Sequence, residues 1–301
     1  MNDKVLITGS DGMVGSRFVE LYPNKNELLA PTIAEFDLLN PHSMERYLKN
    51  NPVSSVINFA AYTDVREAEK DRGNENGLCW NINIKGIKNL VSLFGSKVHL
   101  VHISTDMVFS GSKDDKGPYK EVRCPERDPS KVTWYGYTKG EGENIIREAD
   151  ISSTIIRIIY PVRAKYDNKS DYLRKHLKLY NDDALYPMFS DQKISVTFID
   201  ELCTTIGKIL SDKIRGVYHC SSSDTTTPYE LISYLIEAKY GVKNTVKSAS
   251  IHEFLRTSDN PLRYPIFGGL KCGISQKALG IRYSTCKQIV NKLIGQNISP
   301  R

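Results

Sequence analysis

The sequence predicts an α/β fold, a doubly wound parallel sheet with a second, smaller C-terminal α/β domain. Three observations carry this prediction. Short apolar runs alternate with helical stretches through the first half of the chain, which is typical of parallel sheets. The first apolar run ends in a glycine-rich turn, and polar side chains follow later runs. The alternation stops near residue 160 without a flexible linker, so the second domain is expected to be interwoven with the first.

Composition narrows the class of protein. With 40% hydrophobic residues, a chain of 301 residues can bury a core without disulfides. The six cysteines are far apart and form no C-x-x-C pair, so we expect reduced, buried thiols and no metal site. A net charge of +6, scattered along the chain, argues against nucleic acid as a partner. The short apolar run Val5 to Ile7 is neither a signal peptide nor a membrane span, so we expect a cytoplasmic protein with no membrane partner.

The first strand is expected at Lys4 to Thr8, followed by a glycine loop and a helix. The loop spacing is G-x-x-G-x-x-G, which differs from the common G-x-G-x-x-G dinucleotide fingerprint. Glycines let the backbone approach a diphosphate closely, and the N–H groups at the start of the helix can bind it. The loop residues expected to hold a dinucleotide are Gly9, Asp11, Gly12, Met13, Val14 and Gly15.

Further strands are expected at 28–30, 53–58 and 98–103, with Asn40-Pro41 starting the helix between the first two. Ligands bind at the carboxyl ends of parallel strands. The residues that follow these strands are therefore candidates, namely Ala60 to Thr63 and Ser104 to Asp106. Between them, Asn83 lies in a helical stretch with an apolar side.

Tyr135 and Lys139 lie four positions apart at the expected start of a helix, so both side chains share one helical face. A phenol has a pKa of about 10, and a nearby ammonium favours its ionised form and lowers that pKa. Such a tyrosine can exchange a proton with a carbonyl or an alcohol. The same spacing also arises by chance in many helices, so the neighbouring motifs must decide its meaning.

The rest of the chain is expected to be less regular. The stretch from Ser110 to Ser130 is rich in Gly, Pro, Lys and Asp, which predicts a surface loop long enough to be functional or mobile. Strands are expected at 153–159, 196–199 and 216–220, with Asp200 capping one helix and Thr227-Pro228 opening another. The last 60 residues are expected to be irregular. We place a dinucleotide-binding domain at 1–160, with 192–222 returning to it, and a second domain at 161–301.

The sequence resembles the extended short-chain dehydrogenase/reductases in three motifs that occur in the same order. These are the glycine loop, the Ser-Thr-Asp-x-Val-Phe run at 104–109 and the Tyr-Gly-x-Thr-Lys run at 135–139. The chain is most similar to the dTDP-4-dehydrorhamnose reductase family. The similarity includes Asp37-Leu38, Asn58 to Thr63, Arg157 and Gly216 to His219. The resemblance implies a Rossmann-type domain and reduction of the 4-keto group of a nucleotide-activated 6-deoxyhexose, for deoxysugar and surface polysaccharide synthesis.

The resemblance also implies roles for individual residues. Thr105, Tyr135 and Lys139 would be the catalytic trio, with NADPH or NADH as hydride donor and NADPH slightly favoured. Ser104 is the fallback hydroxyl, since successive residues leaving a strand point to opposite faces. Beyond the glycine loop, the cofactor residues implied are Asp37, Leu38, Ala60, Ala61, Tyr62, Asn83, Ser104, Tyr135 and Lys139. The substrate residues implied are Thr105, Asp106, Val108, Tyr160 and Arg163.

Departures from the family pattern leave the sugar open. Tyr160 stands where the family usually has Trp, and Ile194 and Val196 stand where Gly and Pro are expected. The basic stretch 163–178 is open to two readings, a grip on the substrate diphosphate or a solvated helix face. Cofactor choice is also open, because Thr32 lies near the position that selects between NAD and NADP, and Glu35 comes late.

Two alternatives compete with the reductase. A nucleotide-sugar epimerase of the same superfamily would retain its NAD, and Met107 after Asp106 counts against a dehydratase, which typically has Glu there. A non-catalytic NADP-binding protein would resemble the regulatory subunit of methionine adenosyltransferase. A magnesium-linked dimer is known in the resembled family, which makes a homodimer an expectation, but no residue here is assigned to a metal.

Overall fold

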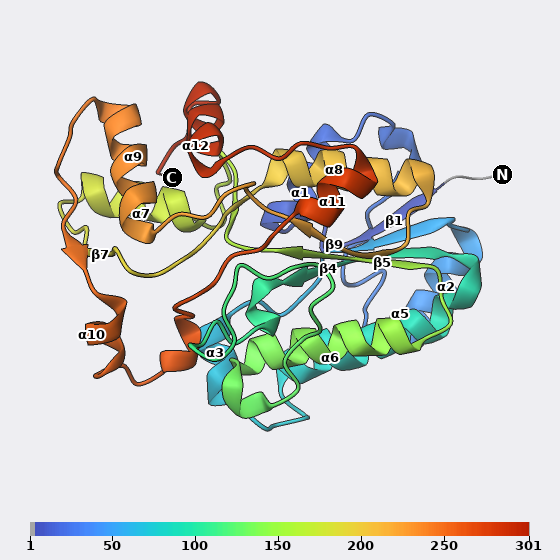
Figure 1. Cartoon of the computed structure of the whole chain (residues 1–301). Coiled ribbons are helices and arrows are strands. Elements are labelled where there is room, and N and C mark those ends of the chain that lie inside the picture. Colours follow the sequence, from blue (N-terminus) through green and yellow to red (C-terminus); the bar gives the residue numbers. More distant parts are fainter. Residues whose placement is uncertain (1–3, 301) are drawn as a thin grey trace. The chain divides into compact units, whose positions relative to one another are not determined.

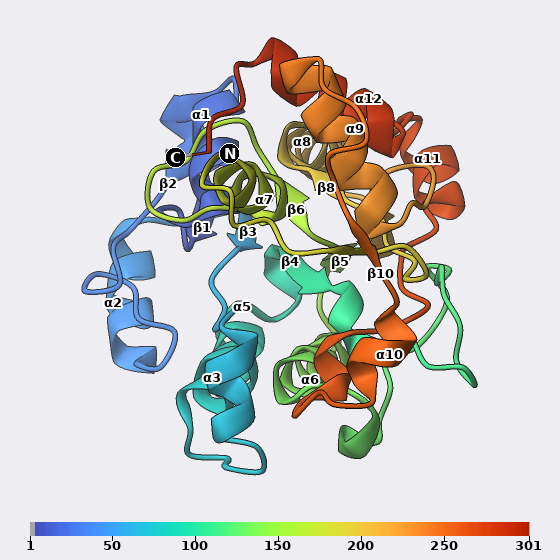
Figure 2. The same cartoon turned by 90° about the vertical axis from the view of Figure 1, so that its left-hand side faces the viewer.

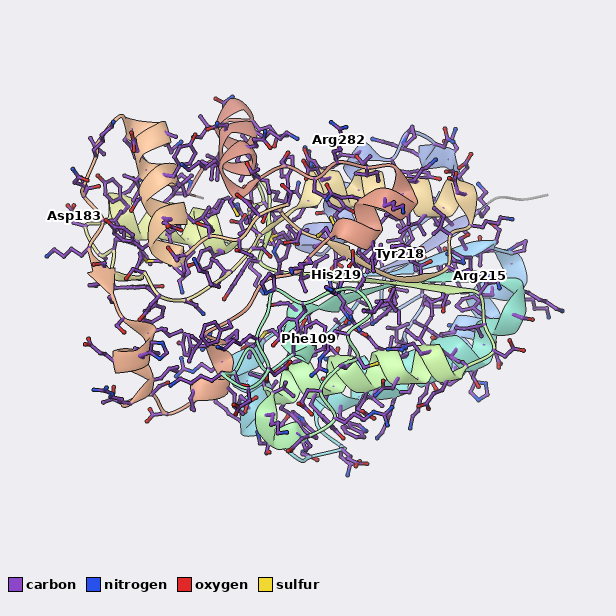
Figure 3. All side chains as sticks on the ribbon, in the orientation of Figure 1. Phe109, Asp183, Arg215, Tyr218, His219 and Arg282 are labelled. Atoms are coloured by element: carbon purple, nitrogen blue, oxygen red, sulfur yellow. The ribbon has the colours of Figure 1, made fainter. Side chains whose placement is uncertain are left out.

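The computed structural model describes residues 4–300, and in it the chain forms two compact units (Figure 1). Unit 1 contains residues up to Phe109, then Cys124–Arg157 and Cys203–Tyr218. Unit 2 contains Ser110–Arg123, Ile158–Leu202 and the residues from His219 onward. One of the passages between the units lies between Tyr218 and His219, which are labelled in Figure 3.

Unit 1 is built on a six-stranded sheet with the order β2-β1-β3-β4-β5-β9. The pairs β1–β2, β1–β3 and β3–β4 are parallel. The strands are β1 (Val5–Thr8), β2 (Leu28–Leu29), β3 (Ser55–Asn58), β4 (His99–Thr105), β5 (Ser153–Ile158) and β9 (Gly216–Cys220). The chain moves to one side of β1 to form β2 and returns on the other side at β3. The gap between the ends of β1 and β3 is therefore the switch point, where ligands bind in such sheets.

Helices cover both faces of this sheet, as the predicted α/β class requires. In Figure 1, α5 and α6 lie on one face and α1 and α8 on the other. The α-helices are α1 (Met13–Leu21), α2 (Pro41–Asn50), α3 (Val65–Lys70), α4 (Leu78–Trp80), α5 (Gly86–Phe94), α6 (Trp134–Glu148) and α8 (Ile199–Asp212). The short turns are η1 (Lys25–Glu27), the π-helix η2 (Asn81–Lys85), η3 (Gly95–Lys97), η4 (Asp106–Val108) and η5 (Pro129–Lys131). Leu6, Leu90 and Leu100 are fully buried in the core of this unit.

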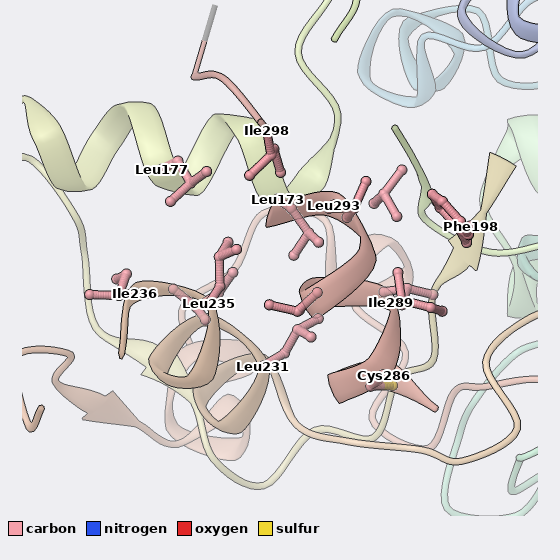
Figure 4. Packing of buried hydrophobic residues seen from close by; sticks show 14 of the residues in the cluster. Leu173, Leu177, Phe198, Leu231, Leu235, Ile236, Cys286, Ile289, Leu293 and Ile298 are labelled. Atoms are coloured by element: carbon pink, nitrogen blue, oxygen red, sulfur yellow. The ribbon is translucent and has the colours of Figure 1, made fainter. Parts of the chain in front are cut away.

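Unit 2 has its own core between α7 (Tyr172–Asn181), α9 (Pro228–Tyr240) and α12 (Cys286–Gly295). Figure 4 shows Leu173, Leu235 and Leu293 meeting there, and α9 and α12 pack side by side (Figure 2). Two small parallel pairs complete the unit, β6 (Pro161–Val162) with β8 (Thr197–Phe198) and β7 (Met188–Phe189) with β10 (Ser248–Ala249). The remaining helices are α10 (Ile251–Leu255), η6 (Pro261–Arg263) and α11 (Gly273–Leu279).

Helix starts were predicted with mixed success. Asn40 caps α2 by accepting from the Ser43 N–H, and Thr227 forms a capping box with Glu230 at the start of α9, so both predictions are confirmed. Asp200 does not cap a helix, because α8 begins at Ile199 and places Asp200 in its first turn. The last 60 residues are not irregular, since they contain β10, α10, α11 and α12.

The expected surface loop after Ser110 is pinned instead of free. Gly117 N donates to Phe267 O at 2.8 Å, and Tyr119 N donates to Gly269 O at 2.9 Å. The Tyr119 ring is buried, and Glu121 accepts from both the backbone and the hydroxyl of Ser275. The residues that hold this segment are 150 or more positions away in the sequence. The composition of the segment therefore could not predict these contacts.

The basic stretch 163–178 is not a uniformly solvated helix face. Arg174 is fully buried and pairs with Asp171 at 2.8 Å, so it supports the fold of unit 2. Arg163 is buried as well, with its guanidinium over the Tyr166 ring. Lys165, Lys169, Lys175 and Lys178 are exposed.

Five of the cysteines are buried, but Cys124 is exposed, contrary to expectation. Among residues 4–300, no helix combines the length and apolar character needed to cross a membrane.

A buried ion pair joins α6 to β5 within unit 1. Glu143 and Arg157 are both fully buried and approach to 2.6 Å, and Glu143 also accepts from the Ser104 hydroxyl at 2.5 Å. Substituting Glu143→Gln should destabilise the protein by about 3–5 kcal/mol, because it leaves the Arg157 charge uncompensated. Urea denaturation measures this loss. The control Asp212→Asn breaks the exposed Lys208–Asp212 pair on α8 and should leave the midpoint unchanged. Equal effects of the two variants would contradict this account.

Candidate active site

The glycine loop after β1 brings three backbone segments into contact. Gly9 has φ +68°, and a β-carbon there would lie 2.7 Å from the Ala60 nitrogen. A β-carbon on Gly15 would lie 2.2 Å from the carbonyl oxygen of Gly9. Gly9 and Gly15 therefore have to be glycines for α1 to start this close to β1 and β3. Gly12 precedes the first turn of α1 and offers no side chain to its N–H groups. The start of α1 thus has the form of a cradle for a phosphate group.

The segment after β3 is fixed by an asparagine. The Asn83 side chain accepts from the Tyr62 N–H at 2.9 Å and donates to the Tyr62 carbonyl and to the Thr138 hydroxyl. Asn83 is 2% exposed and lies in the π-helix η2. Its amide therefore links the loop containing Ala60, Ala61 and Tyr62 to helix α6. This arrangement gives Asn83 a supporting role beside the predicted cofactor loop.

Three residues at the start of α6, Thr133, Gly136 and Thr138, hold this helix against the segment after β4. Thr133 caps α6 by accepting from the Gly136 N–H at 3.1 Å. A β-carbon on Gly136 would lie 2.0 Å from the Met107 carbonyl oxygen, so only glycine lets η4 pack against α6 here. The Thr138 hydroxyl donates to the Tyr135 carbonyl and receives Asn83. These contacts hold the segment after β4 against the start of α6.

Thr105 and Tyr135 lie together at this junction. The Thr105 hydroxyl accepts from the Met107 N–H and donates to Asp106 Oδ1, both at 3.2 Å. Burial raises the pKa of Tyr135, the charge of Asp106 raises it further, and a hydrogen bond with Thr105 opposes both. The phenol is therefore protonated at neutral pH. The sequence predicted the opposite direction for this pKa, and that prediction is wrong for the chain by itself.

Lys139 explains the difference, since its amine is held elsewhere. Its Nζ donates to the Ile103 carbonyl at 2.7 Å and lies 3.1 Å from His102 Nε2. The side chain is 2% exposed, and burial lowers the pKa of Lys139 to about 8, opposed by the charges of Glu143 and Cys79. Lys139 shares a helical face with Tyr135 as predicted, but its contacts are with β4.

Asp106 is a second perturbed group in the site. Burial raises its pKa to about 7, against hydrogen bonds from Thr105 and from the backbone of Met107. A carboxyl group with a raised pKa beside Thr105 and Tyr135 is a candidate functional group.

The other predicted residues are less uniform. The Ser104 hydroxyl donates to Glu143 inside unit 1, which leaves Thr105 as the hydroxyl of the site. Asp37 Oδ1 accepts from the Leu39 N–H, and the Leu38 carbonyl accepts from Asn89. Val108 is 1% exposed.

Two predicted substrate residues belong to unit 2. Tyr160 has φ +38°, a strained conformation for a non-glycine residue, and its ring packs on Tyr172 with centroids 4.7 Å apart. Strain of this kind concentrates at functional sites. Arg163 lies three residues further along the same unit.

Sequence reasoning missed the residues that support the trio. Three buried residues form a row of contacts behind Lys139: His102 contacts Lys139, Asn58 contacts His102, and Thr8 contacts Asn58. Glu143 lies one turn after Lys139 on α6. His102 sits in an apolar run, where a histidine carries no signal in a single sequence. The strand register that aligns it with Asn58 is visible only in the structure.

Comparison with known proteins identifies the family of the chain. Residues 3–297 match the family model described as the RmlD substrate binding domain. The chain is 24% identical to dTDP-4-dehydrorhamnose reductase of Aggregatibacter actinomycetemcomitans, over 96% of this chain and 98% of that protein. It is 29% identical to the spore coat polysaccharide biosynthesis protein SpsK of Bacillus subtilis, over 86% and 87% of the two chains.

A solved structure shares the fold. It is dTDP-4-dehydrorhamnose reductase from Bacillus anthracis in complex with NADP, with a TM-score of 0.81 and 23% identity, covering 98% of this chain and 100% of that one. Other structures with this fold hold NADPH or NAD⁺. Since the family model matches nearly the whole length, the chain belongs to the RmlD substrate binding domain family, whose members include the dTDP-4-dehydrorhamnose reductases.

Proposed function

We propose that the protein is an NAD(P)H-dependent reductase of the 4-keto group of a nucleotide-activated 6-deoxyhexose, acting in the cytoplasm in deoxysugar synthesis for a surface polysaccharide. The observation that supports this proposal is the placement of Thr105 beside Tyr135 at the end of β4, with Lys139 one turn further along α6 and with a loop after β1 whose glycines allow the start of α1 to approach β1 and β3. The names of the relatives agree with it.

The residues of the site suit a reduction. A bound reduced nicotinamide supplies the hydride to the ketone carbon. Negative charge then develops on the ketone oxygen, where the Thr105 hydroxyl can donate a hydrogen bond once it turns away from Asp106 Oδ1. Tyr135, which the chain keeps protonated, donates its proton to that oxygen as a general acid. Tyr135 is protonated at neutral pH, as a general acid must be, but its raised pKa makes the phenol of the chain by itself a weaker acid than a free one.

We propose that the loops after β1 and β3 hold the cofactor. Gly9, Gly12 and Gly15 would contact the diphosphate, with Asp11, Met13 and Val14 in the same turn. Asp37 and Leu38 would contact the adenine. Ala60, Ala61 and Tyr62 lie across the switch point, where Ala60 already approaches Gly9. Glu35, the acid nearest the position that selects the cofactor, accepts from the backbone and the hydroxyl of Thr32.

The residues proposed to contact the substrate, by resemblance to the family, are Asp106, Val108, Tyr160 and Arg163. Purified protein mixed with NADPH or NADH and a panel of nucleotide 4-keto-6-deoxysugars tests the function directly. Cofactor oxidation with one of these sugars supports the proposal. An absence of oxidation with every sugar, or stoichiometric NAD retained through purification, would overturn it, the latter in favour of an epimerase.

Removing the general acid should abolish most of the activity. Tyr135→Phe is expected to lower kcat at least about a hundredfold, because the variant lacks the phenolic proton that the proposal assigns to the ketone oxygen. Stopped-flow or steady-state oxidation of NADPH measures the rate. Tyr137→Phe is the matched control. Tyr137 lies two residues after Tyr135 on α6, and its ring stacks on that of Trp134, so this variant should retain activity. Surviving turnover in the Tyr135 variant would contradict its assignment.

The glycine loop gives a prediction about binding. Gly15→Ala places a β-carbon 2.2 Å from the Gly9 carbonyl oxygen, so the start of α1 must move away from the loop. The affinity for NADPH should fall at least about tenfold, which corresponds to about 1.4 kcal/mol. Titration of cofactor fluorescence measures it. Gly207→Ala, on α8 with no atom within 4 Å of the added carbon, should bind NADPH normally.

Asp106 makes the rate depend on pH. As the pH rises through about 7, its carboxyl loses a proton and places a negative charge where the oxyanion develops. We therefore expect kcat/KM to fall several-fold between pH 6 and pH 8. In Asp106→Asn this step should disappear. If the variant keeps the same pH profile, another group is responsible for it.

A further inference from the structure

Three neighbouring strands of unit 1 place polar residues at the same level of the sheet. Thr8 of β1 is in register with Asn58 of β3, and Asn58 is in register with His102 of β4. The Thr8 hydroxyl lies 2.5 Å from Asn58 Oδ1, and Asn58 Nδ2 lies 3.0 Å from His102 Nδ1. His102 Nε2 then lies 3.1 Å from Lys139 Nζ. We call this row of four residues the Lys139 ladder.

The ladder is almost sealed from water. Asn58 and His102 are 1% exposed, Lys139 is 2% exposed and Thr8 is 5% exposed. A buried polar group without a partner is costly, and here each group has one. Burial and the neighbouring charge of Lys139 lower the pKa of His102 far below its ordinary value. The imidazole is therefore neutral and carries one N–H.

A neutral imidazole couples its two sides, because one nitrogen donates and the other accepts. When Lys139 is an ammonium, His102 Nε2 must accept from it, so Nδ1 carries the proton. The Asn58 amide must then turn, so that its Oδ1 accepts from Nδ1 and its Nδ2 donates to the Thr8 hydroxyl, the reverse of the orientation in the structure. When Lys139 is an amine, Nε2 can donate to it and Nδ1 accepts from Asn58. The direction of the hydrogen bonds along the ladder therefore follows the charge of Lys139.

The far end of the ladder reaches the predicted cofactor loops. Thr8 directly precedes Gly9, and its hydroxyl also receives the Ala60 N–H at 3.4 Å. The same row of bonds thus connects the ends of β1 and β3 to the amine of Lys139.

We propose that His102 is a positioning residue which, with Asn58 and Thr8 behind it, holds the amine of Lys139 against the Ile103 carbonyl and sets its charge state. This proposal rests on the proposed function, since it assigns His102 to the same reduction. The other groups that face Lys139 are Glu143, one turn further on α6 and paired with Arg157, and Cys79 on α4.

Two conservative variants separate the two sides of the imidazole. In His102→Gln the side-chain amide reaches the position of Nε2 and can still accept from Lys139. In His102→Asn the amide reaches only the position of Nδ1, so it keeps Asn58 and leaves Lys139 without this partner. We expect kcat to fall at least about tenfold in the Asn variant and to recover most of that loss in the Gln variant.

The matched control is His99, another buried histidine on β4, which bonds Ser152 and Thr154 instead. His99→Asn should lower the melting temperature without changing kcat. If both His102 variants lose rate in proportion to their loss of melting temperature, or if neither loses rate, His102 has only a packing role and the proposal fails.

A second measurement does not depend on any sugar. In protein labelled with ¹⁵N-lysine, the Lys139 signal, assigned by its loss in Lys139→Met, is followed with pH. The titration midpoint should move to lower pH in His102→Asn, because the ammonium loses an acceptor, and should move less in His102→Gln. Equal midpoints in all three proteins would overturn the proposal. If no sugar is reduced but the midpoint moves as expected, the proposed function fails and the ladder stands.

Discussion

The close approach of backbone segments at the carboxyl edge of the sheet is the constraint on which the site depends. Glycines at 9, 15 and 136 each stand where a β-carbon would meet a backbone atom of another segment. The glycines are needed for space, and in Gly9 also for its positive φ. Because no side chains intervene, the strand ends, the start of α1 and the start of α6 fix one another. The reacting side chains then need few interactions of their own to be held in place.

Burial is the second determinant, and it acts on each ionisable group differently. It keeps Tyr135 protonated, brings Asp106 towards neutrality and makes Lys139 easier to deprotonate. Glu143 and Arg157 are as deeply buried, but each compensates the other. The site is thus a place where charge is poorly compensated, as is common where chemistry needs groups that change protonation.

The fold class, the order of the elements and the Tyr135–Lys139 pair could be predicted because they rest on local patterns, namely period, glycine turns and spacing. The partners of Lys139 could not. Its contacts with His102 and Ile103 depend on how α6 lies on β4, and the pKa of Tyr135 depends on burial, which no spacing reports. The same holds for the segment after Ser110, whose composition suggested a surface loop. Its exposed residues agree with that prediction, but the contacts of Tyr119 and Glu121 with residues 269 to 275 have no local signal.

The passage of the chain between the two units has a consequence for synthesis. Unit 1 takes its last strand, β9, from residues made after much of unit 2 has been translated. Until then the edge of β5 has no partner, because β9 is its neighbour in the sheet. A nascent chain ending near residue 160 therefore exposes an unpaired strand edge, which invites pairing with other chains. During synthesis, the sheet therefore keeps an unpaired edge at β5 while about sixty further residues are added, up to the end of β9.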